Sequence, residues 1–132
     1  MPLKKPTELQ LLRLLGDSPL QVEVDFCHTD SHESTHTDPS YLEENYYVFD
    51  EIKDNYYDGF IITGAPVEQI PFESVDYWPE MKTYFEWAKT HAFSTLHLCW
   101  GAQAALNYYY GIEKRLLPAK PLLHPPVAAY GD

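Results

Sequence analysis

Apolar and polar positions divide the chain into segments with two different periods. Apolar residues recur at helical spacing in residues 8–15, which contain five leucines, and again in residues 75–91, where the repeated positions hold Tyr, Trp, Met and Phe. Thr7 is expected to cap the first helix and Gly16 to end it. The second helix presents an aromatic face, which is more typical of a core than of a cofactor site.

Three shorter segments have the patterns of β-strands. Residues 20–26 alternate between apolar and polar side chains, which predicts a strand with one less buried face, near a sheet edge. Residues 57–63 contain an uninterrupted apolar run, and residues 95–98 are mostly apolar, so both predict buried strands. Short helices are expected at residues 39–46 and 49–53. This alternation of helices and strands predicts an α/β fold with a parallel sheet and helices on its faces.

Cys99 lies between the last predicted strand and a segment rich in small residues, 101–106, which predicts a helix that continues to Tyr110. A sharp turn from strand to helix exposes the side chain at its apex, and a helix N-terminus favours the negatively charged thiolate. The N–H groups of Trp100 and Gly101 are candidate donors to an oxyanion. This is the arrangement of a nucleophile elbow. The alternative is a buried structural cysteine at the end of a core strand.

A second candidate segment follows the strand at residues 57–63. Gly64 stands at the carboxyl end of that strand, where open α/β sheets place their sites, and its backbone N–H is a candidate contact for a ligand. Glu68 lies in the loop just beyond it. The alternative interpretation of this segment is an ordinary turn.

Composition excludes several classes of function. The chain has 132 residues, enough for one domain, and a net charge of −11, which argues against nucleic-acid and acidic-membrane partners. No apolar run is long enough to span a membrane, and residues 1–6 do not form a signal peptide. Its two cysteines, Cys27 and Cys99, make no disulfide framework and fit a reducing cytoplasm. We interpret Cys27 as a buried or loop thiol.

Histidines recur every fourth residue at His28, His32 and His36. On a helix this spacing would suit a metal ion. The segment is rich in Ser and Thr and lacks apolar residues, which favours a solvated loop, so no metal is predicted.

Several segments taken together resemble the homoserine O-acyltransferase family, the homoserine transsuccinylases and transacetylases of methionine biosynthesis. The matching segments are residues 1–8, 10–15, 17–20, 60–68, 75–78, 86–87, 99–106 and 110–112. The resemblance implies a flavodoxin-like fold, as in class I glutamine amidotransferases, with helices on both faces of a parallel sheet. It covers residues 1–112, which we interpret as a partial acyltransferase domain, and leaves residues 113–132 as a divergent Pro-rich tail.

The resemblance implies a ping-pong acyl transfer from acyl-CoA to L-homoserine through a cysteine thioester, with no bound cofactor. Cys99 matches the nucleophile, Lys4 a lysine of the acyl site and Lys120 a substrate-binding lysine. Glu68 occupies the position linked to acyl choice, where a carboxylate would repel a succinyl group, so acetyl-CoA is predicted over succinyl-CoA. A homodimer is a further expectation.

The chain also departs from the family pattern. Family members have an apolar strand that leads into the Met-Pro-x-Lys segment and a His-x-Glu base far beyond the cysteine. Neither is found here, so the sequence predicts an enzyme truncated at both ends, with little turnover. The alternatives are a serine O-acetyltransferase, a non-catalytic fragment that binds acyl-CoA or a partner through a free sheet edge, and, more distantly, a glutamine amidotransferase.

Overall fold

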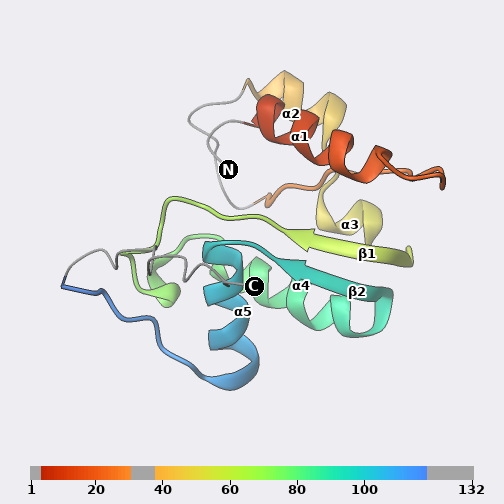
Figure 1. The fold of residues 1–132 in the computed structure, drawn as a ribbon. Coiled ribbons are helices and arrows are strands. Elements are labelled where there is room, and N and C mark those ends of the chain that lie inside the picture. The colour runs from red at the N-terminus through yellow and green to blue at the C-terminus, as the bar shows by residue number, and fades with distance from the viewer. Residues whose placement is uncertain (1–3, 31–37, 119–132) are drawn as a thin grey trace, which may run out of the picture.

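The fold is built around two parallel strands (Figure 1). The computed structural model describes residues 4–30 and 38–118. Its elements, in chain order, are α1 (Lys4–Gly16), α2 (Pro39–Asn45), α3 (Phe49–Ile52), β1 (Tyr57–Ile62), a 3-10 turn (Phe72–Ser74), α4 (Trp78–His91), β2 (Ala92–His97) and α5 (Trp100–Tyr110). Lys120, His32 and His36 lie outside the described residues.

Helices cover both sides of this sheet. In β1 and β2, Tyr57 is opposite Ala92 and Ile62 is opposite His97, and the strands run in the same direction. Figure 1 shows α1 and α2 on one side and α4 and α5 on the other. The predicted α/β class with a parallel sheet is therefore confirmed. Within the described ranges, no helix is long and apolar enough to cross a membrane.

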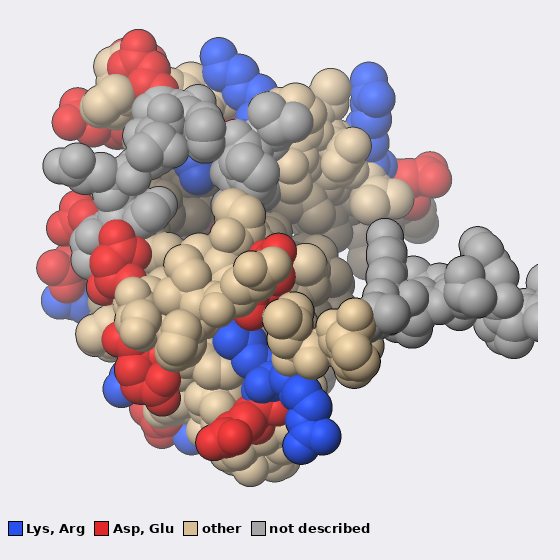
Figure 2. Space-filling view, turned by 90° about the vertical axis from the view of Figure 1, so that its left-hand side faces the viewer, with Lys and Arg blue, Asp and Glu red and all other residues tan. Residues whose placement is uncertain are grey.

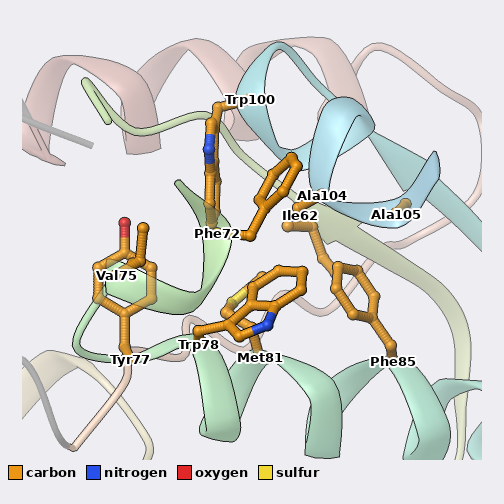
Figure 3. Packing of buried hydrophobic residues seen from close by; sticks show 10 residues of the cluster. All are labelled: Ile62, Phe72, Val75, Tyr77, Trp78, Met81, Phe85, Trp100, Ala104 and Ala105. Atoms are coloured by element: carbon orange, nitrogen blue, oxygen red, sulfur yellow. The ribbon is translucent and has the colours of Figure 1, made fainter. Parts of the chain in front are cut away.

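The core lies between the sheet, α4 and α5, and it is largely aromatic (Figure 3). Phe85 of α4 is 0% exposed and Trp100 of α5 is 1% exposed. The cluster consists of Ile62, Phe72, Val75, Tyr77, Trp78, Met81, Phe85, Trp100, Ala104 and Ala105. The aromatic stripe of residues 75–91 is thus a core face, as its spacing predicts. Burial of these side chains holds α5, and with it the turn that precedes α5, against the sheet.

The predicted strand at residues 20–26 is not formed, and that prediction is wrong. Only the following residue, Cys27, makes an isolated parallel bridge, to Tyr47. Val22 is 46% exposed. Alternation of apolar and polar residues favours a strand only where a neighbouring strand completes its backbone hydrogen bonds. Within the described residues, the segment has one such bond, in which the Phe26 carbonyl oxygen accepts from the Tyr47 N–H at 2.7 Å.

Two helices begin at other residues than their patterns predict. Thr7 is not an N-cap, because α1 already begins at Lys4. Pro6 is tolerated there, since the first-turn N–H groups of a helix have no intrahelical partner. The helix predicted from residue 75 begins at Trp78, after the turn at residues 72–74. The helical period therefore locates each helix but does not fix its first turn.

Gly101 brings α5 into direct contact with β1. A Cβ atom at this position would lie 2.9 Å from Ile62 Cγ2, 2.9 Å from the Ile62 carbonyl oxygen and 3.0 Å from the Thr63 carbonyl oxygen. Two of these three atoms belong to the backbone, which cannot move aside as a side chain can. The close approach positions the N-terminus of α5 beside the end of β1.

We expect Gly101→Ala to lower the free energy of unfolding by about 1–3 kcal/mol, because the added methyl group overpacks this contact. Urea unfolding followed by circular dichroism measures the change. Gly16→Ala is the matched control, since a Cβ at Gly16 has no atom within 4 Å. Equal stabilities of the two variants would contradict the tight packing of α5 on β1.

Candidate active site

Cys99 occupies a strained turn between β2 and α5. Its backbone angles are φ 54° and ψ −124°, and it is the only residue other than glycine with positive φ in the described part of the chain. An L-residue adopts this conformation at a cost of about 1–3 kcal/mol, and such residues cluster at active sites. Its side chain is exposed. The predicted order of strand, cysteine and helix is present, and the exposed thiol does not fit a buried structural cysteine.

Gly64 lies directly against Cys99. A Cβ atom at Gly64 would lie 2.8 Å from Cys99 Cβ, 3.2 Å from Cys99 Sγ and 3.5 Å from the backbone nitrogen of Trp100. Only glycine leaves room for the thiol there, because any side chain would enter the space that Cys99 occupies. The structure therefore brings together three of the residues that the sequence singles out, at the carboxyl ends of both strands.

The backbone N–H groups at this turn differ in their availability. In the described part of the chain, the N–H groups of Gly64 and Trp100 have no hydrogen-bond partner. The Gly101 N–H donates to the Leu98 carbonyl oxygen at 2.9 Å, so its prediction as an oxyanion donor is wrong. The hydrogen bond from Gly101 to Leu98 is the one that closes a tight turn, so the Gly101 N–H is not available to a ligand. Gly64 and Trp100 thus remain as the candidate donors.

The strain at Cys99 leads to a test that is independent of chemistry. We expect Cys99→Gly to be more stable than Cys99→Ala by about 1 kcal/mol, because glycine adopts positive φ freely while its larger unfolded-state entropy offsets part of the gain. Chemical denaturation of the two variants measures the difference. If Cys99→Ala were as stable as Cys99→Gly, the strained backbone at residue 99 would be disproved.

Lys4, at the start of α1, lies beside Tyr46, the residue that follows α2. Its Nζ lies 5.7 Å from the centre of the Tyr46 ring. The Glu8 carboxylate accepts hydrogen bonds from the hydroxyls of Tyr46 and, at 2.7 Å, of Tyr41. Burial lowers the pKa of Lys4, and the charge of Glu8 opposes this effect. Lys4 and Gly64 line the same cavity, and Cys99 is not among the residues that line it.

Glu68 and Lys114 belong to the loop after β1. Glu68 is exposed in a turn of this loop. Lys114 Nζ donates to the carbonyl oxygens of Val67, at 3.2 Å, and of Ile70, and it also lies 4.6 Å from the centre of the Phe72 ring. No sequence pattern points to Lys114, which falls in the segment interpreted as a divergent tail. Through these hydrogen bonds, Lys114 holds the loop after β1 in place, and Gly64 lies at the start of that loop.

The remaining candidate groups do not join this site. Burial, together with the charges of Asp25 and Glu51, raises the pKa of Cys27 to about 12, so its thiol stays protonated near neutral pH. Burial lowers the pKa of His97, whose ring centre lies 5.8 Å from that of Phe85. In residues 4–30 and 38–118, Cys99 makes no hydrogen bond to a histidine or a carboxylate.

The face at which the strands end carries charges of both signs. Figure 2 looks onto that face and shows Asp and Glu most frequently at the left, with Lys and Arg at several places among them. An anionic molecule is therefore not repelled uniformly there, although the chain as a whole carries a net charge of −11.

Fold and turn together define a class: an α/β protein with an exposed cysteine at a strained strand-to-helix elbow. Residues 1–122 match the family described as homoserine O-succinyltransferase. The chain belongs to this family, which confirms the resemblance found in the sequence.

Similar proteins in several bacteria are named homoserine O-acetyltransferase. The protein of Agathobacter rectalis is 62% identical over 120 residues, which are 91% of this chain and 39% of that protein. That of Bifidobacterium adolescentis is 59% identical over 91% of this chain and 35% of its own length. The protein of Streptococcus thermophilus strain LMD-9 is 58% identical over 91% of this chain and 38% of its own length. The chain spans less than two fifths of the length of these curated relatives.

Proposed function

We propose that this chain carries the nucleophile of a homoserine O-acetyltransferase of methionine biosynthesis. The observation that carries the proposal is the exposed Cys99 at its strained turn, with Gly64 against it. The names of the relatives support homoserine and an acetyl donor as the substrates. Two free cysteines support a reducing, cytoplasmic location as part of the same proposal.

In the first half-reaction, the Cys99 thiolate attacks the thioester carbonyl carbon of acetyl-CoA. The carbonyl oxygen becomes an oxyanion, to which the N–H groups of Gly64 and Trp100 donate. When the oxyanion collapses, the bond to the CoA sulfur breaks, and CoA leaves as a thiolate that takes a proton from water. The acetyl group is then a thioester on Cys99.

In the second half-reaction, the homoserine hydroxyl attacks this thioester and Cys99 leaves as a thiolate. The hydroxyl proton needs a base, and general base catalysis contributes about 10² to 10⁴-fold. Because no histidine or carboxylate among the described residues is hydrogen-bonded to Cys99, we expect this chain to carry out the first half-reaction and little of the second. Lys4 is proposed as a lysine of the acyl site and Lys120 as a homoserine-binding residue.

A comparison of the two acyl donors, acetyl-CoA and succinyl-CoA, tests the proposed role of Glu68. We expect acetyl-CoA to modify the chain and succinyl-CoA to modify it at least about tenfold more slowly, because the Glu68 carboxylate repels the free carboxylate of the succinyl group. Glu68→Gly should reduce the difference between the rates with acetyl-CoA and succinyl-CoA. Glu73→Gly changes an exposed acidic residue further along the chain and should leave that difference unchanged. Intact-mass spectrometry measures both adducts. Equal rates for the two donors with wild-type chain would contradict the role of Glu68.

A further inference from the structure

The side chain of Lys114 joins the two ends of the turn that carries Glu68. This turn spans residues 67–70, and the Ile70 N–H closes it by donating to the Val67 carbonyl oxygen at 3.1 Å. Glu68 is the first of the two residues at its centre. Lys114 Nζ donates to the carbonyl oxygens of both end residues. One ammonium group from another part of the chain therefore holds both ends of the turn together.

The backbone that leads to Lys114 is itself anchored to the end of α5. Gly111 ends the helix with φ 67°, and its N–H donates to the Asn107 carbonyl oxygen at 2.8 Å. The Ile112 N–H donates to the Leu106 carbonyl oxygen, and the Asn107 side chain donates to the Ile112 carbonyl oxygen, each at 3.3 Å. Figure 1 shows the chain after α5, in blue, turning back toward the loop after β1, which Lys114 contacts. The lysine therefore reaches the turn from a defined starting point.

The same ammonium group lies against the aromatic core. Lys114 Nζ is 4.6 Å from the centre of the Phe72 ring, and Phe72 is 5% exposed. A cation over an aromatic ring is attracted to it, more strongly where water is partly excluded. The Phe72 ring centre lies 5.1 Å from that of Trp78 and 6.1 Å from that of Trp100, the residue after Cys99. Lys114 thus ties the turn to the core that also holds the cysteine elbow.

We propose that Lys114 is a positioning residue for Glu68 and controls how strongly the chain prefers acetyl-CoA over succinyl-CoA. This inference rests on the proposed function, in which the Glu68 carboxylate repels the free carboxylate of the succinyl group. Repulsion between two charges depends on the distance between them. Glu68 is exposed, whereas Lys114 is half-buried, so the place of the carboxylate is defined by the turn that the lysine holds.

Replacement of Lys114 by methionine tests this proposal in the full chain, because it removes the ammonium group and keeps an unbranched apolar side chain. We expect the ratio of the acetylation rate to the succinylation rate to fall by at least about threefold, since Glu68 is no longer held in place. Intact-mass spectrometry at several times measures both rates. Arg115→Met is the matched control, because it removes the exposed positive charge of the next residue, and it should leave the ratio unchanged.

A double-mutant cycle separates positioning from a general loss of structure. Glu68→Gln removes the charge that Lys114 positions, so Lys114→Met should have no further effect on the ratio in a chain that carries Glu68→Gln. An equal fall of the ratio with and without Glu68→Gln would overturn the proposal. So would an unchanged ratio with both rates reduced. A ratio that rises in Lys114→Met would also overturn it, because the ammonium group would then act by attracting the succinyl carboxylate.

Hydrogen exchange of the Ile70 amide, measured by NMR, tests the hold on the turn without any acyl transfer. In Lys114→Met we expect this amide to exchange at least about fivefold faster, while the Leu98 amide, which donates to Ile62 of β1, stays protected. In Arg115→Met the exchange of Ile70 should not change. If Lys114→Met also lost protection at Leu98, Lys114→Gln, which keeps a donor group, would replace it in both experiments.

The two readouts fail separately. An original chain that forms no adduct with either donor would contradict the proposed function, and the exchange of Ile70 would then decide alone whether Lys114 holds the turn. Unchanged exchange of Ile70 in Lys114→Met would overturn the inference about Lys114 and leave the proposed function of Cys99 in place.

Discussion

Replacing Cys99 with alanine is expected to abolish the covalent adduct that acetyl-CoA forms with the chain. The thioester needs a sulfur nucleophile, and alanine leaves the turn without one. Because Cys99 is the exposed cysteine of the two, the loss should be complete rather than partial. Intact-mass spectrometry after incubation with acetyl-CoA measures the adduct.

Cys27→Ala provides the matched control, since it also removes one thiol. The pKa of Cys27 is raised to about 12, so below pH 9 this thiol is almost wholly protonated and a poor nucleophile. The adduct should therefore form on Cys27→Ala as on the original chain. An adduct that survives in Cys99→Ala and disappears in Cys27→Ala would reverse the assignment of the nucleophile.

Gly64→Ala is expected to slow acetylation of Cys99 by about 10²-fold. The new methyl group would lie 2.8 Å from Cys99 Cβ and 3.2 Å from Cys99 Sγ, so the thiol must move by several tenths of an ångström or more. Displacements of this order cost about 10²-fold in rate when the reacting atoms lose their alignment. The rate of adduct formation, followed by mass spectrometry at several times, measures the effect.

Gly59→Ala is the control for this experiment, because it adds the same methyl group to β1 at a position with no atom within 4 Å. Its acetylation rate should remain within about twofold of the original. If Gly64→Ala reacted as fast as Gly59→Ala, the contact between Gly64 and Cys99 would have no part in positioning the thiol.

Local sequence signals were sufficient for the elements that build the elbow. The helical period of residues 75–91 identifies α4, because six of its apolar or aromatic positions are buried: Trp78, Met81, Tyr84, Phe85, Trp87 and Ala88. The apolar run of residues 57–63 identifies β1, and small residues after Cys99 identify α5. For α4 and α5, the partners that bury the pattern are present in the described residues, whereas in β1 only Ile62 is buried.

Other features depend on contacts that sequence spacing does not contain. The alternation of residues 20–26 requires a neighbouring strand, and without one the segment does not join the sheet. Lys114 reaches the loop after β1 across more than forty positions, a pairing that no local pattern encodes. The requirement for glycine at residue 64 follows from the position of Cys99, so it becomes visible only when both are placed in the fold.

Peptide mapping shows whether Cys99 is the residue that takes the acetyl group from acetyl-CoA. The full chain is mixed with acetyl-CoA, quenched in acid and digested, and the modified residue is located by tandem mass spectrometry. We expect acetyl on Cys99, as a thioester that hydroxylamine removes, and none on Cys27. Acetyl found on lysine side chains alone, or no acetyl on a chain whose circular dichroism shows it to be folded, would contradict it.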